Sequence, residues 1–135
     1  MVKIVVDTSI FIEEIRKGSL ELAELAELAS REEVDLYIPV IIITELWAGR
    51  SMNKAKVRAL VEKKLGPFKR IEVNEKIARA SGELIRKEQV KGIDAIVAAC
   101  CLEKRARLAT LNTKHFEKVK GLKLWKRSIT DPERC

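Results

Sequence analysis

Short apolar runs alternate along this chain with longer segments whose apolar residues recur every three or four positions. The runs are rich in β-branched residues and predict strands at 3–6, 34–38, 71–73, 107–111 and 122–125. The segments between them predict helices at 9–16, 20–29, 40–48 and 57–65, after Asn74, from Asp94 and at 112–119. Because such helices act as crossover connections, we expect a three-layer α/β/α fold with a mostly parallel central sheet.

The composition fits one folded domain over residues 1–135, with 128–135 as a frayed tail. Of the 135 residues, 47% are hydrophobic and 35% are charged, which is too apolar for a disordered chain. The longest apolar run, 95–102, is too short to span a bilayer, and Lys3 and Asp7 interrupt the N-terminal apolar residues of a would-be signal peptide. We therefore expect a cytoplasmic protein without membrane contact, whose Cys100, Cys101 and Cys135 are free thiols.

Four polar side chains fall near the ends of strands or the starts of helices: Asp7, Glu45, Asp94 and Asn112. In open α/β sheets, ligands bind beyond the carboxyl ends of the strands, so these four side chains are expected at one rim. Asp7, Asp94 and Asn112 each also fit a purely structural role as a helix cap, or else as an acid in the first helical turn for Asp94 and as a turn residue for Asn112. Glu45 lies between apolar residues, where an ionised carboxylate needs a partner.

If the three carboxylates converge, their repulsion requires a cation among them. Two like charges about 4 Å apart cost roughly 4 kcal/mol at an effective dielectric constant of about 20. Oxygen ligands without a neighbouring His or Cys favour Mg²⁺ or Mn²⁺ over zinc. Such an ion activates water and stabilises charge on a phosphodiester, so the pattern indicates phosphodiester chemistry.

The positive charge of the chain is segregated. Residues 50–70 carry eight basic residues and one acid, and residues 104–127 carry nine and one, whereas residues 13–35 hold eight acids against three basic residues. A basic surface beside an acidic pocket suits a nucleic acid whose backbone is bound by Lys and Arg. The alternative is that these are ordinary solvated helix faces.

Four short motifs resemble those of PIN-domain nucleases, and VapC-type toxins in particular: 5–9 (VVDTS), 43–46 (ITEL), 92–99 (GIDAIVAA) and 108–116 (LATLNTKHF). The resemblance covers nearly the whole chain. It implies an endoribonuclease that depends on Mg²⁺ or Mn²⁺, forms a homodimer and is inhibited by a cognate antitoxin. It assigns metal binding to Asp7, Glu45 and Asp94, and catalysis to these three with Asn112. Hydroxyl groups beside the metal would come from Thr8, Ser9 and Thr110.

The fourth motif departs from the family pattern, since many members carry an acid where this chain has only Asn112 and His115. A neutral amide is a weaker ligand for Mg²⁺ than a carboxylate, so the pattern fits either one or two bound metal ions. It also does not identify the general base. A PIN-like module that binds RNA or a protein without cutting is the rival interpretation. We interpret His115 as a surface residue and Trp47 and Trp125 as packing residues. P-loop and dinucleotide-binding functions are excluded because no Gly-rich phosphate loop occurs.

Overall fold

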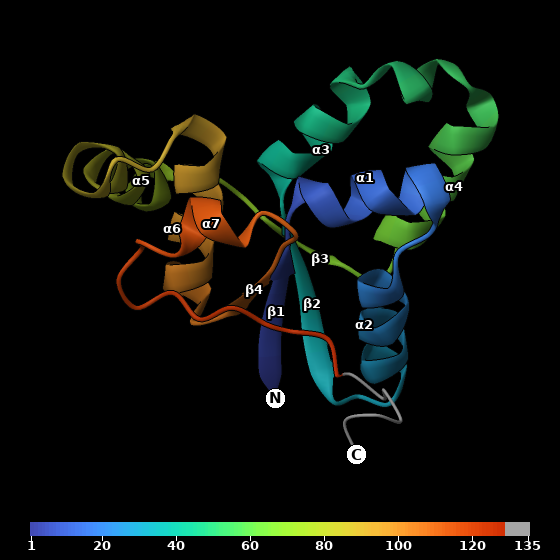
Figure 1. Ribbon diagram of the computed structural model, residues 1–135, viewed down its shortest axis with the longest axis horizontal. Helices are drawn as coiled ribbons and strands as arrows, with labels where there is room; N and C mark the ends of the chain where they lie inside the picture. Colours follow the sequence, from blue (N-terminus) through green and yellow to red (C-terminus); the bar gives the residue numbers. More distant parts are fainter. Residues whose placement is uncertain (129–135) are drawn as a thin grey trace.

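The computed structural model describes residues 1–128 and is built on a four-stranded parallel sheet in the order β3-β2-β1-β4. The strands are β1 (Val2–Val6), β2 (Val34–Pro39), β3 (Lys69–Ile71) and β4 (Arg107–Ala109). Helices α1, α2 and α4 lie on one side of the sheet and α5 and α6 on the other (Figure 1). The predicted α/β fold with helices on both faces is confirmed. The helical elements are α1 (Thr8–Lys17), α2 (Leu20–Ser30), α3 (Val40–Ala48), the 3₁₀ helix η1 (Arg50–Asn53), α4 (Ala55–Leu65), α5 (Glu75–Glu88), α6 (Gly92–Lys104) and α7 (Thr113–Phe116).

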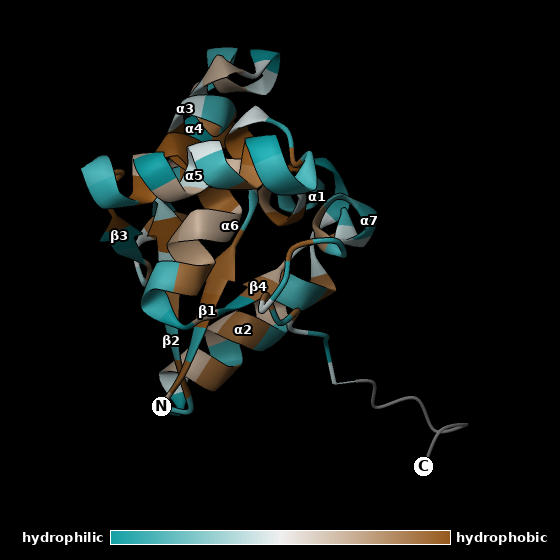
Figure 2. Ribbon diagram, turned by 90° about the vertical axis from the view of Figure 1, so that its left-hand side faces the viewer, coloured by the Kyte–Doolittle hydropathy of each residue, from teal (hydrophilic) through white to brown (hydrophobic). Residues whose placement is uncertain are grey.

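Strand β1 is the centre of the domain. Ile4, Val5 and Val6 have no exposed surface, since strands flank them on both sides and helices cover both faces. Such a strand requires an unbroken apolar run rather than an alternating one, as the sequence shows. β1 is accordingly coloured as hydrophobic through most of its length in Figure 2. Because all four strands run in one direction, their carboxyl ends meet at one edge of the sheet.

Side-chain caps begin three of the helices and fix where the chain leaves each preceding segment. Asp7 caps α1, Ser19 caps α2 and Asn74 caps α5, the last by accepting the Ile77 backbone N–H at 2.9 Å. Satisfying these otherwise free N–H groups stabilises a helix by about 1 kcal/mol each. The cap at Asp7 sets the direction of α1 directly after the central strand.

Several predicted boundaries were wrong at the ends of strands. β3 ends at Ile71 and leaves Val73 39% exposed, and β4 ends at Ala109 rather than at residue 111. The strand expected at 122–125 is a single parallel bridge between Leu108 and Leu124. Only Leu108 reaches this segment, since its N–H donates to the Lys123 carbonyl and its carbonyl accepts the Trp125 N–H. The last predicted helix, 112–119, is shorter in the structure, where α7 spans Thr113–Phe116.

The buried residues form one hydrophobic cluster that includes residues from both sides of the sheet. The prediction of a single domain over residues 1–135 itself stays a prediction. The expected frayed tail lies outside the described residues, apart from Ser128, whose N–H donates to Glu24 at 2.9 Å. Among residues 1–128, no helix combines the length and the apolar character that crossing a membrane demands.

Candidate active site

A cleft of about 520 Å³ opens at the edge of the sheet where the strands end. Its walls come from α1 and α3 on one side and from α6 and the segment before α7 on the other (Figure 1). The predicted side chains that line it are those of Asp7, Thr8, Ser9, Glu45, Asp94 and Asn112.

Asp7 is the most firmly held of these side chains. It is only 5% exposed, and its Oδ1 accepts the Ser9 backbone N–H at 3.0 Å and the Ser9 hydroxyl at 2.5 Å. Its Oδ2 accepts the Thr110 hydroxyl at 2.6 Å. The structural interpretation of Asp7 as a cap is therefore correct, and it does not exclude a functional role because the carboxylate still faces the cleft.

The pKa of Asp7 is raised above its usual value, mainly because burial disfavours the charged form. Hydrogen bonds from Ser9 and Thr110 act in the opposite direction, and the negative charge of Asp94 adds to the rise. The charge of Asp94 thus acts on Asp7 across the cleft. A cation bound between them would relieve both the burial cost and this repulsion.

Glu45 has the partner that its apolar neighbours demanded. The side chain is half-buried on α3, and its Oε1 accepts a hydrogen bond from the hydroxyl of Thr8 at the start of α1. This contact ties two helices together at the cleft, across 37 positions of sequence. It leaves the second carboxylate oxygen of Glu45 without a hydrogen bond from residues 1–128.

Asp94 lies in the first turn of α6 but does not cap it, since Lys91 occupies the cap position. Its Oδ2 is 3.2 Å from Nδ1 of His115 on α7. Asp94 is thus not a helix cap, but the alternative structural role, an acid in the first helical turn, is confirmed. His115 is 59% exposed, as predicted for a surface residue, yet it contacts a cleft carboxylate.

Asn112 stands at the cap position of α7 without a capping hydrogen bond from its side chain. Its backbone N–H donates to the Thr110 hydroxyl at 3.0 Å, which holds the turn in place. The Ser9 hydroxyl likewise accepts the Leu111 backbone N–H at 2.9 Å. Thr110 lies beneath the cleft rather than on its wall, and with Ser9 it connects Asp7 to the turn that presents the Asn112 amide.

The donor set suits a hard divalent cation in chemical type, since it consists of carboxylate and amide oxygens. The spacing is looser than we expected: within residues 1–128, no three Asp, Glu, His or Cys side chains converge closely enough to hold a metal ion together. The arrangement therefore offers direct ligands from fewer than three carboxylates, with the remainder available to hold metal-bound water.

Three charged residues of the cleft were missed by the sequence analysis: Glu13, Arg16 and Lys17. They extend the face of α1 that begins with Thr8 and Ser9, at successive helical turns. Lys17 pairs with Glu13 at 3.5 Å. Helical periodicity could have identified Glu13 and Arg16, because they follow Ser9 at four and seven positions and therefore share its face of the helix.

None of the Lys and Arg residues of the two basic stretches lines the main cleft, whose cations are Arg16 and Lys17. A smaller hollow of about 210 Å³ adjoins it on the far side of Asp94. This hollow is lined by Lys91, Lys114 and Lys118 together with His115. A basic surface thus lies beside the acidic cleft, as predicted, and it comes from α7 and its flanks rather than from residues 50–70.

The PIN domain family model matches residues 4–122. The fold is similar to VapBC2 from Rickettsia felis, solved bound to a DNA fragment from its promoter, with a TM-score of 0.79 and 22% identity over 94% of this chain and 100% of that chain. DNA-bound VapBC from Salmonella typhimurium has a TM-score of 0.77 and 23% identity, covering 93% and 98%. A toxin-antitoxin complex from Klebsiella pneumoniae has a TM-score of 0.69 and 25% identity, covering 87% and 93%. No curated protein sequence matches the chain.

Proposed function

Because the chain belongs to the PIN domain family, we propose that it is an endoribonuclease that requires Mg²⁺ or Mn²⁺ and serves as the toxin of a toxin-antitoxin pair. One observation carries the proposal: Asp7, Glu45 and Asp94 come from separate elements and line the same cleft at the carboxyl ends of the strands. Acids that distant in sequence have no packing reason to share a cleft, whereas a divalent cation gives them one.

In this proposal, Asp7 and Asp94 hold the metal ion and Glu45 completes the site through a metal-bound water. The ion, when bound, lowers the pKa of a water molecule and stabilises charge on the phosphodiester. The chain prepares the carboxylates in advance: Ser9 and Thr110 orient Asp7, and Thr8 orients Glu45. Such support from neighbouring groups keeps ligands in position without cost at the moment of reaction.

The cations around the cleft suit an RNA backbone. Arg16 and Lys17 lie at one end of it, where they can contact a phosphate next to the scissile one. On the other side of Asp94, Lys91, Lys114 and Lys118 continue the positive surface. The Asn112 amide, which is exposed at the rim, is placed to donate a hydrogen bond to a phosphate oxygen.

A metal-dependent cleavage assay tests the proposal. Structured and unstructured RNA would be incubated with the protein in Mg²⁺, in Mn²⁺ and in EDTA, and cleavage is expected with either ion and not in EDTA. Asp94→Asn is the matched control, because this partly exposed side chain caps no helix and its loss leaves the fold intact. We expect this variant to lose at least about 100-fold in cleavage rate. Cleavage that continues unchanged in the variant or in EDTA would contradict the proposal.

The loose spacing of the carboxylates favours a second candidate function, a PIN-like module that binds RNA or protein without cutting it. Asn112, where many relatives carry an acid, points the same way. Such a module would retain its affinity for RNA when Asp94 is neutralised and would show no cleavage in either metal. The same assay therefore distinguishes the two functions if RNA binding is measured in parallel.

The proposed partners are RNA, a cognate antitoxin and a second copy of the chain in a homodimer. The structural neighbours include toxin-antitoxin complexes, and Ile12 and Leu111 expose apolar surface at the cleft, 38% and 42% respectively. An antitoxin segment that covers these residues would block the cleft. Co-expression with the product of a neighbouring reading frame, followed by size-exclusion chromatography with light scattering, tests both the complex and the dimer.

A further inference from the structure

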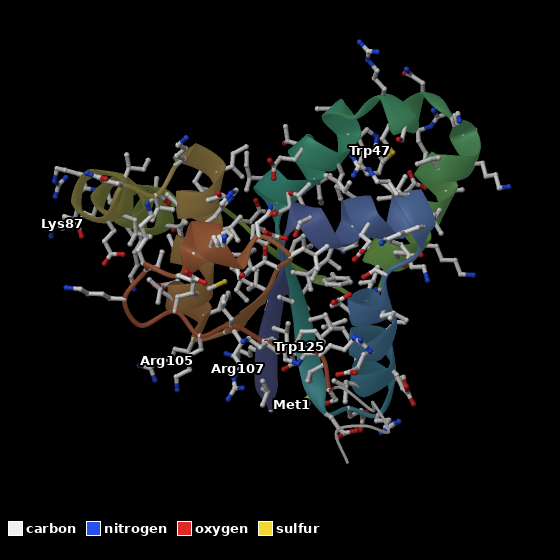
Figure 3. All side chains as sticks on the ribbon, in the orientation of Figure 1. Met1, Trp47, Lys87, Arg105, Arg107 and Trp125 are labelled. Atoms are coloured by element: carbon white, nitrogen blue, oxygen red, sulfur yellow. The ribbon has the colours of Figure 1, made fainter. Side chains whose placement is uncertain are left out.

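A second hollow lies at the opposite end of the sheet from the cleft, where β1 and β4 begin. It has a volume of about 440 Å³ and is formed by the start of β1, the end of α6 and the segment around Gly121. Figure 3 shows Arg105 and Arg107 projecting from the same end of the molecule as Met1. Five basic residues line this hollow, which we name the basic hollow: Lys3, Lys104, Arg105, Arg107 and Lys123.

The charges of the basic hollow are not neutralised by the described part of the chain. No Asp or Glu lines it, and none of its five cations forms an ion pair within residues 1–128. The acid next to Lys3 across the sheet is Asp35, which is paired with Lys69 at 3.4 Å. Lys104 rests over the ring of Tyr37, 5.7 Å from its centroid, a contact that leaves its charge in place.

A purely structural role explains only some of the five cations of the basic hollow. Cations at the end of a helix are favoured by the helix dipole, which accounts for Lys104 and Arg105 at the end of α6. It does not account for Lys3 or Arg107, which lie on strands, or for Lys123, whose backbone carbonyl bonds to β4. Gathering five like charges raises the free energy of the folded chain unless an anion is present to offset it.

We propose that the basic hollow is a second nucleic-acid contact, which binds backbone phosphates of an RNA whose other end occupies the cleft. This inference rests on RNA as the proposed substrate. Arg side chains bind phosphate with two parallel hydrogen bonds, and Arg105 and Arg107 both line the basic hollow. The segment after α7 connects Lys118, which lines the hollow beside Asp94, to Lys123 in the basic hollow, and it carries Lys120 between them.

The size of the domain sets the length of RNA that is required. A folded domain of 135 residues has a radius of gyration of about 14 Å, so opposite sides of the domain lie roughly 35 Å apart. At about 3.4 Å per stacked nucleotide, an RNA needs on the order of ten nucleotides to reach both sites. A longer RNA gains affinity by occupying the two sites at once, whereas a six-nucleotide RNA occupies only one.

The test measures the binding of 6- and 24-nucleotide RNAs by fluorescence anisotropy in EDTA, so that it does not depend on cleavage. The variant is Arg105→Gly with Arg107→Gln. Gly suits the left-handed backbone of Arg105, at φ 55°, and Arg107 is exposed, so the fold is expected to persist. The control is Lys56→Gln with Lys63→Gln, which removes the same charge from exposed positions on α4, away from the basic hollow.

We expect the variant to bind the 24-nucleotide RNA roughly three- to tenfold more weakly, with a salt dependence reduced by about one to two units of slope, and the α4 control to change it less than twofold. The affinity gained between 6 and 24 nucleotides should shrink in the variant alone. Equal losses in variant and control, or no loss in either, would overturn the proposal. So would a poly-glutamate peptide that competes for the basic hollow better than RNA does, since the partner would then be a protein.

The two proposals fail separately in this design. A protein that binds RNA through the basic hollow but cleaves none refutes the nuclease function alone. A protein that cleaves RNA with metal, while its basic-hollow variant binds the long RNA normally, refutes the second contact alone.

Discussion

The two ends of the sheet carry opposite kinds of charged site. In the cleft at the carboxyl ends, Asp7, Glu45 and Asp94 each have a hydrogen-bonding partner from another part of the chain. In the basic hollow at the amino ends, the five cations make no ion pair within residues 1–128.

The difference indicates two different tasks. Carboxylates that are fixed before a ligand arrives suit chemistry that depends on position, such as holding a metal ion against a phosphodiester. Long, unpaired Lys and Arg side chains adapt to many backbone geometries and contribute charge without sequence information. The parallel sheet separates the tasks, because all its carboxyl ends lie at one edge and all its amino ends at the other.

Asp7→Asn gives the largest expected effect and affects activity and stability in opposite directions. Loss of the carboxylate should lower the cleavage rate at least about 100-fold. Burial raises the pKa of Asp7, so its ionised form destabilises the folded protein at neutral pH. The neutral amide removes this cost, and thermal unfolding in EDTA at pH 7 should show a melting temperature a few degrees higher than that of the wild type.

The pH dependence checks the cause of that stabilisation. Since the folded state binds the Asp7 proton more tightly than the unfolded state, this group lowers stability as pH rises from about 3.8, its ordinary pKa, through the raised value. The advantage of Asp7→Asn should therefore vanish below pH 3.8 and be complete above the raised pKa. A variant that is less stable than the wild type at pH 7 would show that the three hydrogen bonds to the carboxylate outweigh its burial.

Thr8→Val tests whether fixed geometry matters at the cleft. The substitution preserves shape but removes the hydroxyl that donates to Glu45, and we expect roughly a tenfold loss in kcat/KM with unchanged RNA affinity. Thr8→Ser keeps the hydroxyl and should restore most of the rate. If Val and Ser behave alike, the contact between α1 and α3 has no part in positioning Glu45.

His115→Ala is expected to have a smaller effect, about threefold in kcat, because its contact with Asp94 is partly exposed to solvent. His115→Asn places a polar atom near the position of Nδ1 and should behave like the wild type. Full activity of the Ala variant would show that His115 is only a surface residue, as predicted from the sequence.

The cysteines, which take no part in the proposed cleavage, test whether the positive field of the basic hollow reaches the interior. Burial raises the pKa of Cys100 to about 11, although the charge of Lys104 acts in the opposite direction. The pKa of Cys101 is also raised by burial. At pH 8, iodoacetamide should label Cys100 roughly 100-fold more slowly than a free thiol of pKa 9, and Cys101 should also react more slowly than a free thiol. Fast labelling of Cys101, as read by peptide mass spectrometry, would mean that the basic hollow stabilises a thiolate.

The sequence was most informative where one physical requirement dominated. Residues 4–6 of β1 had to be apolar because they are buried on both faces, and the helix at 40–48 was predicted with its observed bounds. The parallel direction of the strands followed from the alternation of strands and helices along the chain. The predicted ends of β3 and β4 were wrong because the apolar residues that suggested them, Val73 and Leu111, lie beyond the strands and are exposed.

At the site, the sequence indicated which residues meet but not how each is held. Asp7, Glu45, Asp94 and Asn112 were expected at one rim from their positions next to strands. The contact of His115 with Asp94 depends on where α7 packs, and the hydrogen bond from the Thr110 hydroxyl to Asp7 spans 103 positions, so neither follows from local pattern. Arg16 and Lys17 were counted only as charge, although helical periodicity places them in the cleft.

Binding of Mn²⁺, followed by electron paramagnetic resonance of the free ion, tests most directly whether the cleft acids act together as a metal site. The wild type should bind Mn²⁺, and Asp7→Asn, Glu45→Gln and Asp94→Asn should each weaken binding at least about tenfold. Glu13→Gln, which alters an acid in the same cleft that is already paired with Lys17, should bind like the wild type. Wild-type affinity in all three variants, or an equal loss in Glu13→Gln, would contradict the account.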